Sequence, residues 1–191
     1  KLITQLFGDR MYIANATGCS SIWGGSAPST PYTVNKDGKG PAWANSLFED
    51  NAEYGYGMYL AQSTIRNRTI AKVLELSKTT KAAALKKACE EYLETVDDGE
   101  KNSPATDNLI AALKKTKNKA TEEILKDADY LRKKSMWIFG GDGWAYDIGF
   151  SGVDHVIAQG QDVNIFVFDT EVYSNTGGQS SKSTPTRCNG C

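Results

Sequence analysis

Hydrophobic and polar residues follow three different patterns along the chain. Residues 1–57 contain short apolar runs separated by Gly, Ser and Asn. Residues 58–134 are rich in Ala, Lys, Leu and Glu, and residues 135–186 return to short apolar runs broken by glycine. Apolar residues at helical spacing predict helices, whereas short continuous apolar runs are typical of buried strands. The pattern therefore predicts an α/β fold with a helical insertion at 58–134.

The middle segment predicts a series of helices. We expect helices over Met58–Ser77, over Lys81–Val96, and from Ser103 through Lys119 and onward toward Lys134. Ser103 followed by Pro104 is typical of an N-cap residue and a proline at the first helical position. Wide charged faces favour a solvated insertion, with a partner-binding face as the alternative.

The last segment predicts a βαβ unit. Its strands are the apolar runs Met136–Phe139 and Val163–Phe168, and the stretch Trp144–Gln159 between them is expected to be a helix that stops at Gly160. The two strands should be parallel neighbours with a right-handed crossover. Ligands in such sheets bind at the carboxyl ends of the strands. Another short strand is expected at Met11–Ala14.

Composition narrows the possible partners. With 22 Lys and Arg against 23 Asp and Glu, the formal net charge is −1, which argues against a nucleic-acid partner. Because His155 is the single histidine, a zinc site or catalytic triad that needs two histidines is excluded. No apolar run approaches the roughly 18 residues of a membrane span, and the N-terminal residues show no secretory signal. We therefore expect a cytoplasmic protein with no membrane partner.

The first strand of the βαβ unit ends in candidate cofactor chemistry. Gly141 and Gly143 permit a tight turn, and the following helix presents its positive end to a diphosphate. The Asp142 carboxylate would repel that anion unless a divalent cation such as Mg²⁺ lay between them. The Thr170 hydroxyl and the Val172 carbonyl, at the end of the neighbouring strand, are expected to complete the cation site. The alternative is a plain turn with Asp142 as the helix N-cap.

These residues also carry a family resemblance. Gly-Asp-Gly followed by a polar pair on the next strand is similar to the thiamine-diphosphate signature. Four longer runs closely resemble the pyruvate:ferredoxin (flavodoxin) oxidoreductase family: Ile13–Gly24, Gly40–Asp50, Trp137–Gly149 and Asp169–Lys182. The resemblance implies an incomplete parallel-sheet thiamine-diphosphate- and Mg²⁺-binding domain over residues 1–186, including the insertion at 58–134, with an atypical tail at 187–191.

The resemblance implies an activity and partners as well. Enzymes of the family cleave pyruvate oxidatively with coenzyme A, giving acetyl-CoA and CO₂. They pass the electrons through [4Fe–4S] clusters to ferredoxin or flavodoxin. The resemblance also implies a homodimer, further domains and a cytoplasmic location, or a hydrogenosome-like organelle if the source is an anaerobic eukaryote. The isolated chain is expected to be inactive.

Individual roles follow from the resemblance. Asp142, Thr170 and the Val172 carbonyl match the family's Mg²⁺ ligands, and Gly141 and Gly143 match its turn against the diphosphate.

Four further residues match the surroundings of the cofactor in the family. Thr17 and Gly18 match the segment where the cofactor approaches the proximal cluster, and Cys19 matches one of that cluster's four thiolate ligands. Asn175 matches an asparagine that faces the reacting centre. Trp144 is the best tryptophan candidate for lining the cofactor site.

Three departures from the family leave alternatives open. The Cys-x-x-Cys pair expected before Lys1 and the activating glutamate have no match, and the chain stops at Cys188-Asn-Gly-Cys191. The two cysteines of that tail have cluster-ligand spacing. They either supply ligands to a cluster or have no role. Cys89 is expected to be a structural or free thiol. The alternatives for the chain are a truncated non-catalytic cofactor-binding module, an oxidoreductase of another 2-oxoacid, and an iron-free thiamine-dependent decarboxylase or synthase, against which Cys19 argues.

Overall fold

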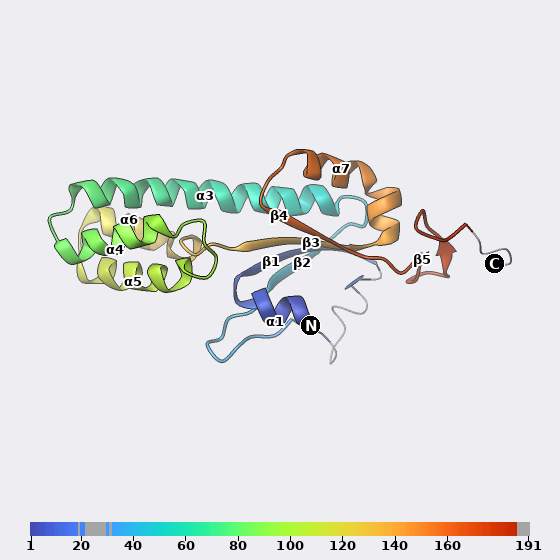
Figure 1. Ribbon diagram of the computed structural model, residues 1–191, viewed down its shortest axis with the longest axis horizontal. Helices are drawn as coiled ribbons and strands as arrows, with labels where there is room; N and C mark the ends of the chain where they lie inside the picture. Colours follow the sequence, from blue (N-terminus) through green and yellow to red (C-terminus); the bar gives the residue numbers. More distant parts are fainter. Residues whose placement is uncertain (19, 22–29, 31, 187–191) are drawn as a thin grey trace. The chain divides into compact units, whose positions relative to one another are not determined.

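The computed structural model describes residues 1–18, 20–21, 30 and 32–186. The chain forms two compact units (Figure 1). Lys1–Tyr59 and Ser135–Cys191 form the α/β unit, and Leu60–Lys134 form the helical unit. Each unit has a hydrophobic core of its own.

A four-stranded parallel sheet organises the α/β unit. Its strand order is β2-β1-β3-β4, with bounds Met11–Ala16 for β1, Ala42–Ser46 for β2, Ser135–Gly141 for β3 and Val163–Phe168 for β4. The predicted neighbours β3 and β4 pair in parallel, with Ile138 opposite Ile165. The structure therefore confirms the α/β class and the parallel sheet.

Strand β2 was not predicted. Its sequence Ala-Trp-Ala-Asn-Ser has an apolar run of only three residues. It becomes a strand by pairing along β1, with Ile13 opposite Trp43 and Asn15 opposite Asn45. Local pattern was also too weak to predict four short elements: α1 (Leu2–Phe7), the 3₁₀ turn η1 (Gly8–Arg10), and the antiparallel pair β5 (Val172–Tyr173) and β6 (Gln179–Ser180).

The single helix expected over Trp144–Gln159 is wrong. The chain instead forms a π-helical turn, η3 (Gly143–Ile148), followed by α7 (Phe150–Ala158). The Gly149 N–H donates to the Trp144 carbonyl at 2.7 Å, a five-residue spacing that α-helical geometry does not provide. A Cβ on Gly149 would collide with the Trp144 indole. The predicted stop at Gly160 is confirmed, since its φ of +59° suits glycine.

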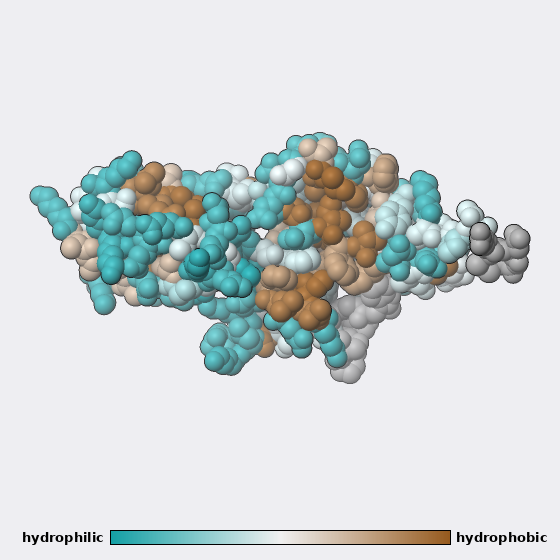
Figure 2. Space-filling view, viewed as in Figure 1, coloured by the Kyte–Doolittle hydropathy of each residue, from teal (hydrophilic) through white to brown (hydrophobic). Residues whose placement is uncertain are grey.

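The sheet has two different faces. Ala16, Ile138 and Trp144 belong to a core with partly buried Val163 and Ile165, on the side that α7 covers in Figure 1. The opposite face carries Met11, Ile13 and Phe139, with partly buried aromatic residues around them: Phe7, Tyr32, Trp137, Phe166 and Phe168. In the view of Figure 2, hydrophobic residues also gather at the surface over α7 and β4. Among the residues of α7, Phe150 and Ile157 are exposed.

Helix α3 (Asn51–Thr79) begins seven residues before the predicted Met58. The first residues of the helix include Gly55, which lies where the helix approaches the sheet closely. A Cβ there would lie 2.5 Å from Ile138, so only glycine fits this contact. Tertiary packing thus outweighs the weak helix propensity of glycine.

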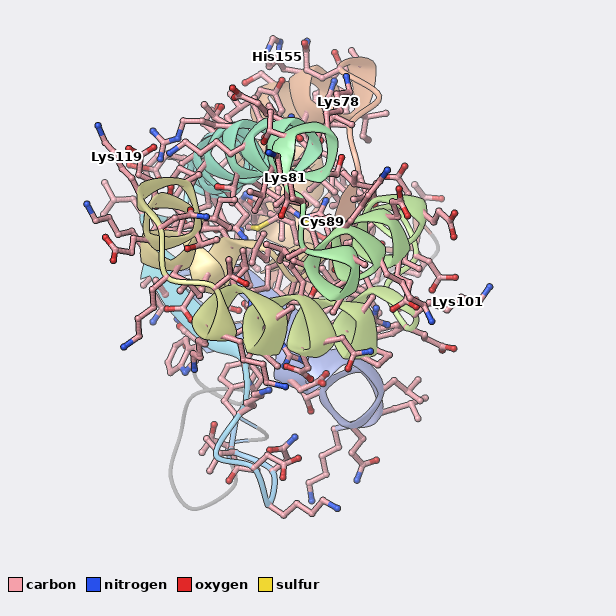
Figure 3. The ribbon with its side chains drawn as sticks, turned by 90° about the vertical axis from the view of Figure 1, so that its left-hand side faces the viewer. Lys78, Lys81, Cys89, Lys101, Lys119 and His155 are labelled. Atoms are coloured by element: carbon pink, nitrogen blue, oxygen red, sulfur yellow. The ribbon has the colours of Figure 1, made fainter. Side chains whose placement is uncertain are left out.

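The helical unit has a closed core. Beyond α3 it contains α4 (Ala83–Glu94), α5 (Asn102–Lys115), α6 (Lys119–Lys126) and the 3₁₀ turn η2 (Ala128–Tyr130). Cys89, Tyr92 and Leu109 are fully buried in it. Figure 3 shows Cys89 inside the unit, whereas Lys101 and Lys119 extend outward. None of the helices in the described ranges is both long and apolar enough to cross a bilayer.

Two details of the predicted third helix are wrong. It begins at Asn102 without a side-chain cap, so Ser103 is not the N-cap, and it ends at Lys115 rather than continuing through Lys119. Asn118 instead starts the next helix: its side chain accepts from the Thr121 N–H, and Thr121 bonds back to the Asn118 N–H. This reciprocal capping box explains why a new helix begins there.

Candidate cofactor and metal site

The predicted site residues lie at one edge of the parallel sheet. Thr17 follows β1, Asp142 follows β3 and Thr170 follows β4. Because parallel strands end at the same edge, these residues gather at the carboxyl ends, where such sheets bind ligands.

Asp142 has a buried and fully hydrogen-bonded carboxylate. Only 1% of the residue is exposed. Its Oδ1 accepts from the Thr170 N–H at 3.2 Å and lies 3.1 Å from the Thr170 hydroxyl. Its Oδ2 accepts from the Ser181 hydroxyl, and from the Ser183 hydroxyl at 3.0 Å. Asp142 occupies the N-cap position of the following turn, as the alternative expected, but its carboxylate makes no capping bond there.

The hydrogen bonds keep Asp142 ionised. Burial acts to raise the pKa of the carboxyl group, but the bonds from the Ser181 hydroxyl, the Thr170 N–H and the Ser183 hydroxyl outweigh burial. The pKa is therefore lowered from its ordinary value, since hydrogen bonds to the charged form favour it. A buried carboxylate that remains charged at neutral pH is suited to binding a cation.

Three oxygens expected to bind Mg²⁺ come together here. The Thr170 hydroxyl oxygen lies 3.1 Å from Asp142 Oδ1 and 3.1 Å from the Val172 carbonyl. The Thr170 hydroxyl has a single proton and donates it to one of these two acceptors. The other contact brings two oxygens together with no hydrogen bond between them. Two oxygens at right angles around Mg²⁺, each at about 2.1 Å, are about 3.0 Å apart. The donor chemistry and the spacing therefore fit Mg²⁺.

Ser181 and Ser183 are functional candidates that sequence reasoning missed. They lie 39 and 41 residues after Asp142, and no periodic pattern links them to it. The only local signal is the hydroxyl-rich run Ser180-Ser-Lys-Ser-Thr184, which is also typical of an ordinary loop.

Tyr173 connects the segment that contains Thr170 and Val172 to the Gly-Asp-Gly turn. Its ring lies against Gly143, where a Cβ would collide with it, and its hydroxyl donates to Asp147 at 3.1 Å. Asp147 also accepts from the Lys182 backbone N–H at 3.3 Å and pairs with the Lys182 ammonium at 3.8 Å. The glycine at 143 is thus required by a neighbouring side chain as well as suited to an anion.

The residues that follow β1 are linked to the same part of the site by hydrogen bonds and by packing. The Thr17 hydroxyl and N–H both bond to the Ser46 carbonyl at the end of β2. Gly18 has a φ of +152°, and a Cβ there would lie 3.3 Å from the Phe48 ring. The Phe48 and Tyr173 rings are 6.5 Å apart. Packing therefore links Gly18, through Phe48 and Tyr173, to the turn at Gly143.

The remaining candidates have different surroundings. Trp144 is fully buried, and its indole N–H has no acceptor among the described residues. Asn175 is exposed on the loop between β5 and β6. Cys19 and the tail at 187–191 lie outside the described residues. Within the described part of the chain, no three His, Cys, Asp or Glu side chains group as a metal site. The partners of the Asp142 oxygens are instead the Thr170 N–H and hydroxyl groups of Thr170, Ser181 and Ser183.

Comparison with known proteins gives the family. No protein-family model matches the chain. It is 56% identical over 193 residues to pyruvate:ferredoxin oxidoreductase of Moorella thermoacetica and 57% identical over 187 residues to pyruvate-flavodoxin oxidoreductase of Klebsiella pneumoniae, with 97% of the chain matched in each case. The chain corresponds to one segment of the pyruvate:ferredoxin (flavodoxin) oxidoreductase family. It spans about 16% of the length of these two relatives.

The family segment also occurs in a protein with a different name. The mitochondrial pyruvate dehydrogenase (NADP⁺) of Euglena gracilis is 51% identical over 187 residues, with 96% of the chain matched and 10% of that protein covered. The names of these three relatives therefore give different electron acceptors, and all three names include pyruvate.

Proposed function

We propose that this chain forms the thiamine-diphosphate- and Mg²⁺-binding part of an oxidoreductase that oxidatively decarboxylates pyruvate with coenzyme A. The observation that carries the proposal is the meeting of the Asp142, Thr170 and Val172 oxygens at the carboxyl edge of a parallel sheet. The names of the relatives support pyruvate as the substrate and ferredoxin or flavodoxin as the electron acceptor.

The residues at the sheet edge have separate tasks in this proposal. Asp142, the Thr170 hydroxyl and the Val172 carbonyl would hold Mg²⁺, which neutralises the diphosphate beside the buried carboxylate. The backbone around Gly141 and Gly143 would approach the diphosphate at the start of η3. Asn175 would face the reacting centre. When bound, thiamine diphosphate would supply the carbanion chemistry needed for loss of CO₂ from a 2-oxoacid.

The proposal includes an iron–sulfur cluster. Cys19 follows the Thr17-Gly18 turn at the end of β1, and we propose it as one thiolate ligand of a [4Fe–4S] cluster. The other ligands, the electron-acceptor surface and the second subunit of a homodimer would come from outside this chain. Ligation by Cys19 distinguishes the proposal from an iron-free thiamine-dependent decarboxylase.

The proposal is tested on the intact native protein that contains this sequence. We expect bound thiamine diphosphate, Mg²⁺ and iron, together with pyruvate- and coenzyme A-dependent reduction of ferredoxin or flavodoxin. In the Cys19→Ser variant the iron content should fall while thiamine diphosphate stays bound, with Cys89→Ser as the matched control. A protein with thiamine diphosphate and no iron would favour the decarboxylase. A protein that binds no thiamine diphosphate would refute the proposal.

A further inference from the structure

We propose that Ser181 and Ser183 are positioning residues that leave a single oxygen of Asp142 available to a cation, and so select Mg²⁺ over Ca²⁺. This inference rests on the proposed function and assigns a task to two residues that lie far from the Gly-Asp-Gly turn in the sequence.

The two Asp142 oxygens face different groups. Oδ2 accepts from the hydroxyls of Ser181 and Ser183, which occupy the directions in which a second oxygen could reach a cation. Oδ1 faces Thr170, whose hydroxyl also meets the Val172 carbonyl at 3.1 Å. Because the residue is only 1% exposed, water has little access to replace a lost hydroxyl. The carboxylate is thereby held in one orientation.

The serine pair is itself held in place. The Ser181 N–H donates to the Thr184 hydroxyl at 2.9 Å, and the Ser183 N–H donates to the Ser181 hydroxyl at 3.3 Å. The Thr184 hydroxyl donates to the Glu171 carbonyl, between Thr170 and Val172 in the chain. This tie connects the serine turn directly to the segment that carries two of the proposed ligands.

Coordination chemistry explains the selectivity. Mg²⁺ demands octahedral geometry and takes its oxygens at about 2.0–2.1 Å, whereas Ca²⁺ takes six to eight oxygens at about 2.3–2.6 Å and often binds both oxygens of one carboxylate. Hydrogen bonds to a ligating carboxylate orient it and tune the metal. Two hydroxyls on Oδ2 oppose two-oxygen binding by Asp142, which costs Ca²⁺ more than Mg²⁺. The 3.1 Å oxygen spacing at Thr170 agrees with the smaller ion.

The experiment measures thiamine diphosphate binding to the intact protein by calorimetry, titrated separately with Mg²⁺ and with Ca²⁺. The test variant is the double substitution Ser181→Ala and Ser183→Ala. The control variant is Ser180→Ala, which removes an exposed serine from β6. A second variant, Ser183→Thr, retains a hydroxyl on the same side-chain carbon, Cβ, and tests whether the hydroxyl alone is sufficient.

We expect the ratio of Mg²⁺ to Ca²⁺ affinity to fall at least fivefold in the double variant and to stay within twofold in Ser180→Ala and Ser183→Thr. An unchanged ratio in the double variant, whether both affinities drop together or neither changes, would overturn the inference and leave the proposed function standing. Failure of the unsubstituted protein to bind thiamine diphosphate with either cation would instead overturn the proposed function.

Discussion

The two units differ in how they use charge. The α/β unit has 11 Asp and Glu against 6 Lys and Arg, whereas the helical unit has 16 Lys and Arg against 12 Asp and Glu. In the helical unit, charged side chains form exposed pairs such as Lys87 with Glu91, which contribute little to stability. Among the described residues, the one buried charged side chain is Asp142 in the α/β unit. The candidate site is therefore distinguished by one buried carboxylate that stays ionised. The number of charged residues in a unit does not distinguish it.

The cores of the units differ as well. In the helical unit, Tyr92, Leu109 and Leu131 have no exposed surface, and the Tyr92 hydroxyl donates to the Leu131 carbonyl at 2.9 Å. In the α/β unit, every residue of β4 is only partly buried. The helical unit thus has the features of a structural insertion, and the α/β unit carries the candidate site. Four predictions test this division, in order of decreasing expected effect.

The largest effect is expected from Asp142→Asn. Loss of the carboxylate charge should weaken Mg²⁺-dependent thiamine diphosphate binding about a thousandfold, or about 4 kcal/mol, while the heat-induced unfolding of the helical unit stays unchanged. Calorimetric titration and a circular dichroism melt measure the two effects. The matched control is Asp154→Asn on α7, an exposed carboxylate that should leave binding unchanged. Binding retained in Asp142→Asn would disprove the ligand assignment.

Leu109→Ala should have the reverse effect. Truncation of this fully buried leucine leaves a cavity in the helical core and should lower the free energy of unfolding of that unit by about 3 kcal/mol. Denaturant unfolding measures the loss, and thiamine diphosphate affinity should change less than twofold. Leu74→Ala, at a position 44% exposed, should cost much less. A large loss of cofactor affinity in Leu109→Ala would break the proposed division between the units.

Tyr173→Phe should have a moderate effect on the α/β unit. The substitution keeps the ring against Gly143 but removes the hydroxyl that donates to Asp147 at 3.1 Å. The loss of one hydrogen bond to a charged group should cost about 1.5 kcal/mol and appear as an affinity for thiamine diphosphate with Mg²⁺ that is weaker by about tenfold. Tyr54→Phe, at a position of α3 that is 40% exposed, should change nothing measurable. Equal affinities for Tyr173→Phe and the unsubstituted protein would show that this tie does not position the site.

The smallest effect concerns Cys89. Burial, followed by the nearby Glu90 carboxylate, raises the pKa of this thiol to about 11, so the reactive thiolate is scarce at neutral pH. We expect Cys89 of the folded protein to resist alkylation at pH 8 and to react only when the helical unit unfolds. Peptide mass spectrometry after iodoacetamide treatment measures this, with the denatured protein as the control. Rapid labelling in the native state would show that the helical core opens readily.

Prediction from sequence was best where one local pattern dominated. The continuous apolar runs of β3 and β4 predicted a parallel pair, and the structure confirms it. Prediction was weakest where contacts with distant parts of the chain decide the local conformation. Strand β2 depends on β1 for its pairing, and the early start of α3 depends on how closely Gly55 approaches Ile138. The π-helical turn at Gly143–Ile148 likewise depends on the packing of Trp144.

Residue types and their order along the chain were enough to predict the chemistry of the candidate site. A glycine-flanked carboxylate after one buried strand, and a hydroxyl after the next, meet at one sheet edge because parallel strands must end together. The folded chain was needed to show which groups complete the candidate site. Ser181 and Ser183 reach Asp142 from about 40 residues away, and Tyr173 covers Gly143. No local period encodes such contacts, since they arise when a folded loop returns to a buried charge that must be satisfied.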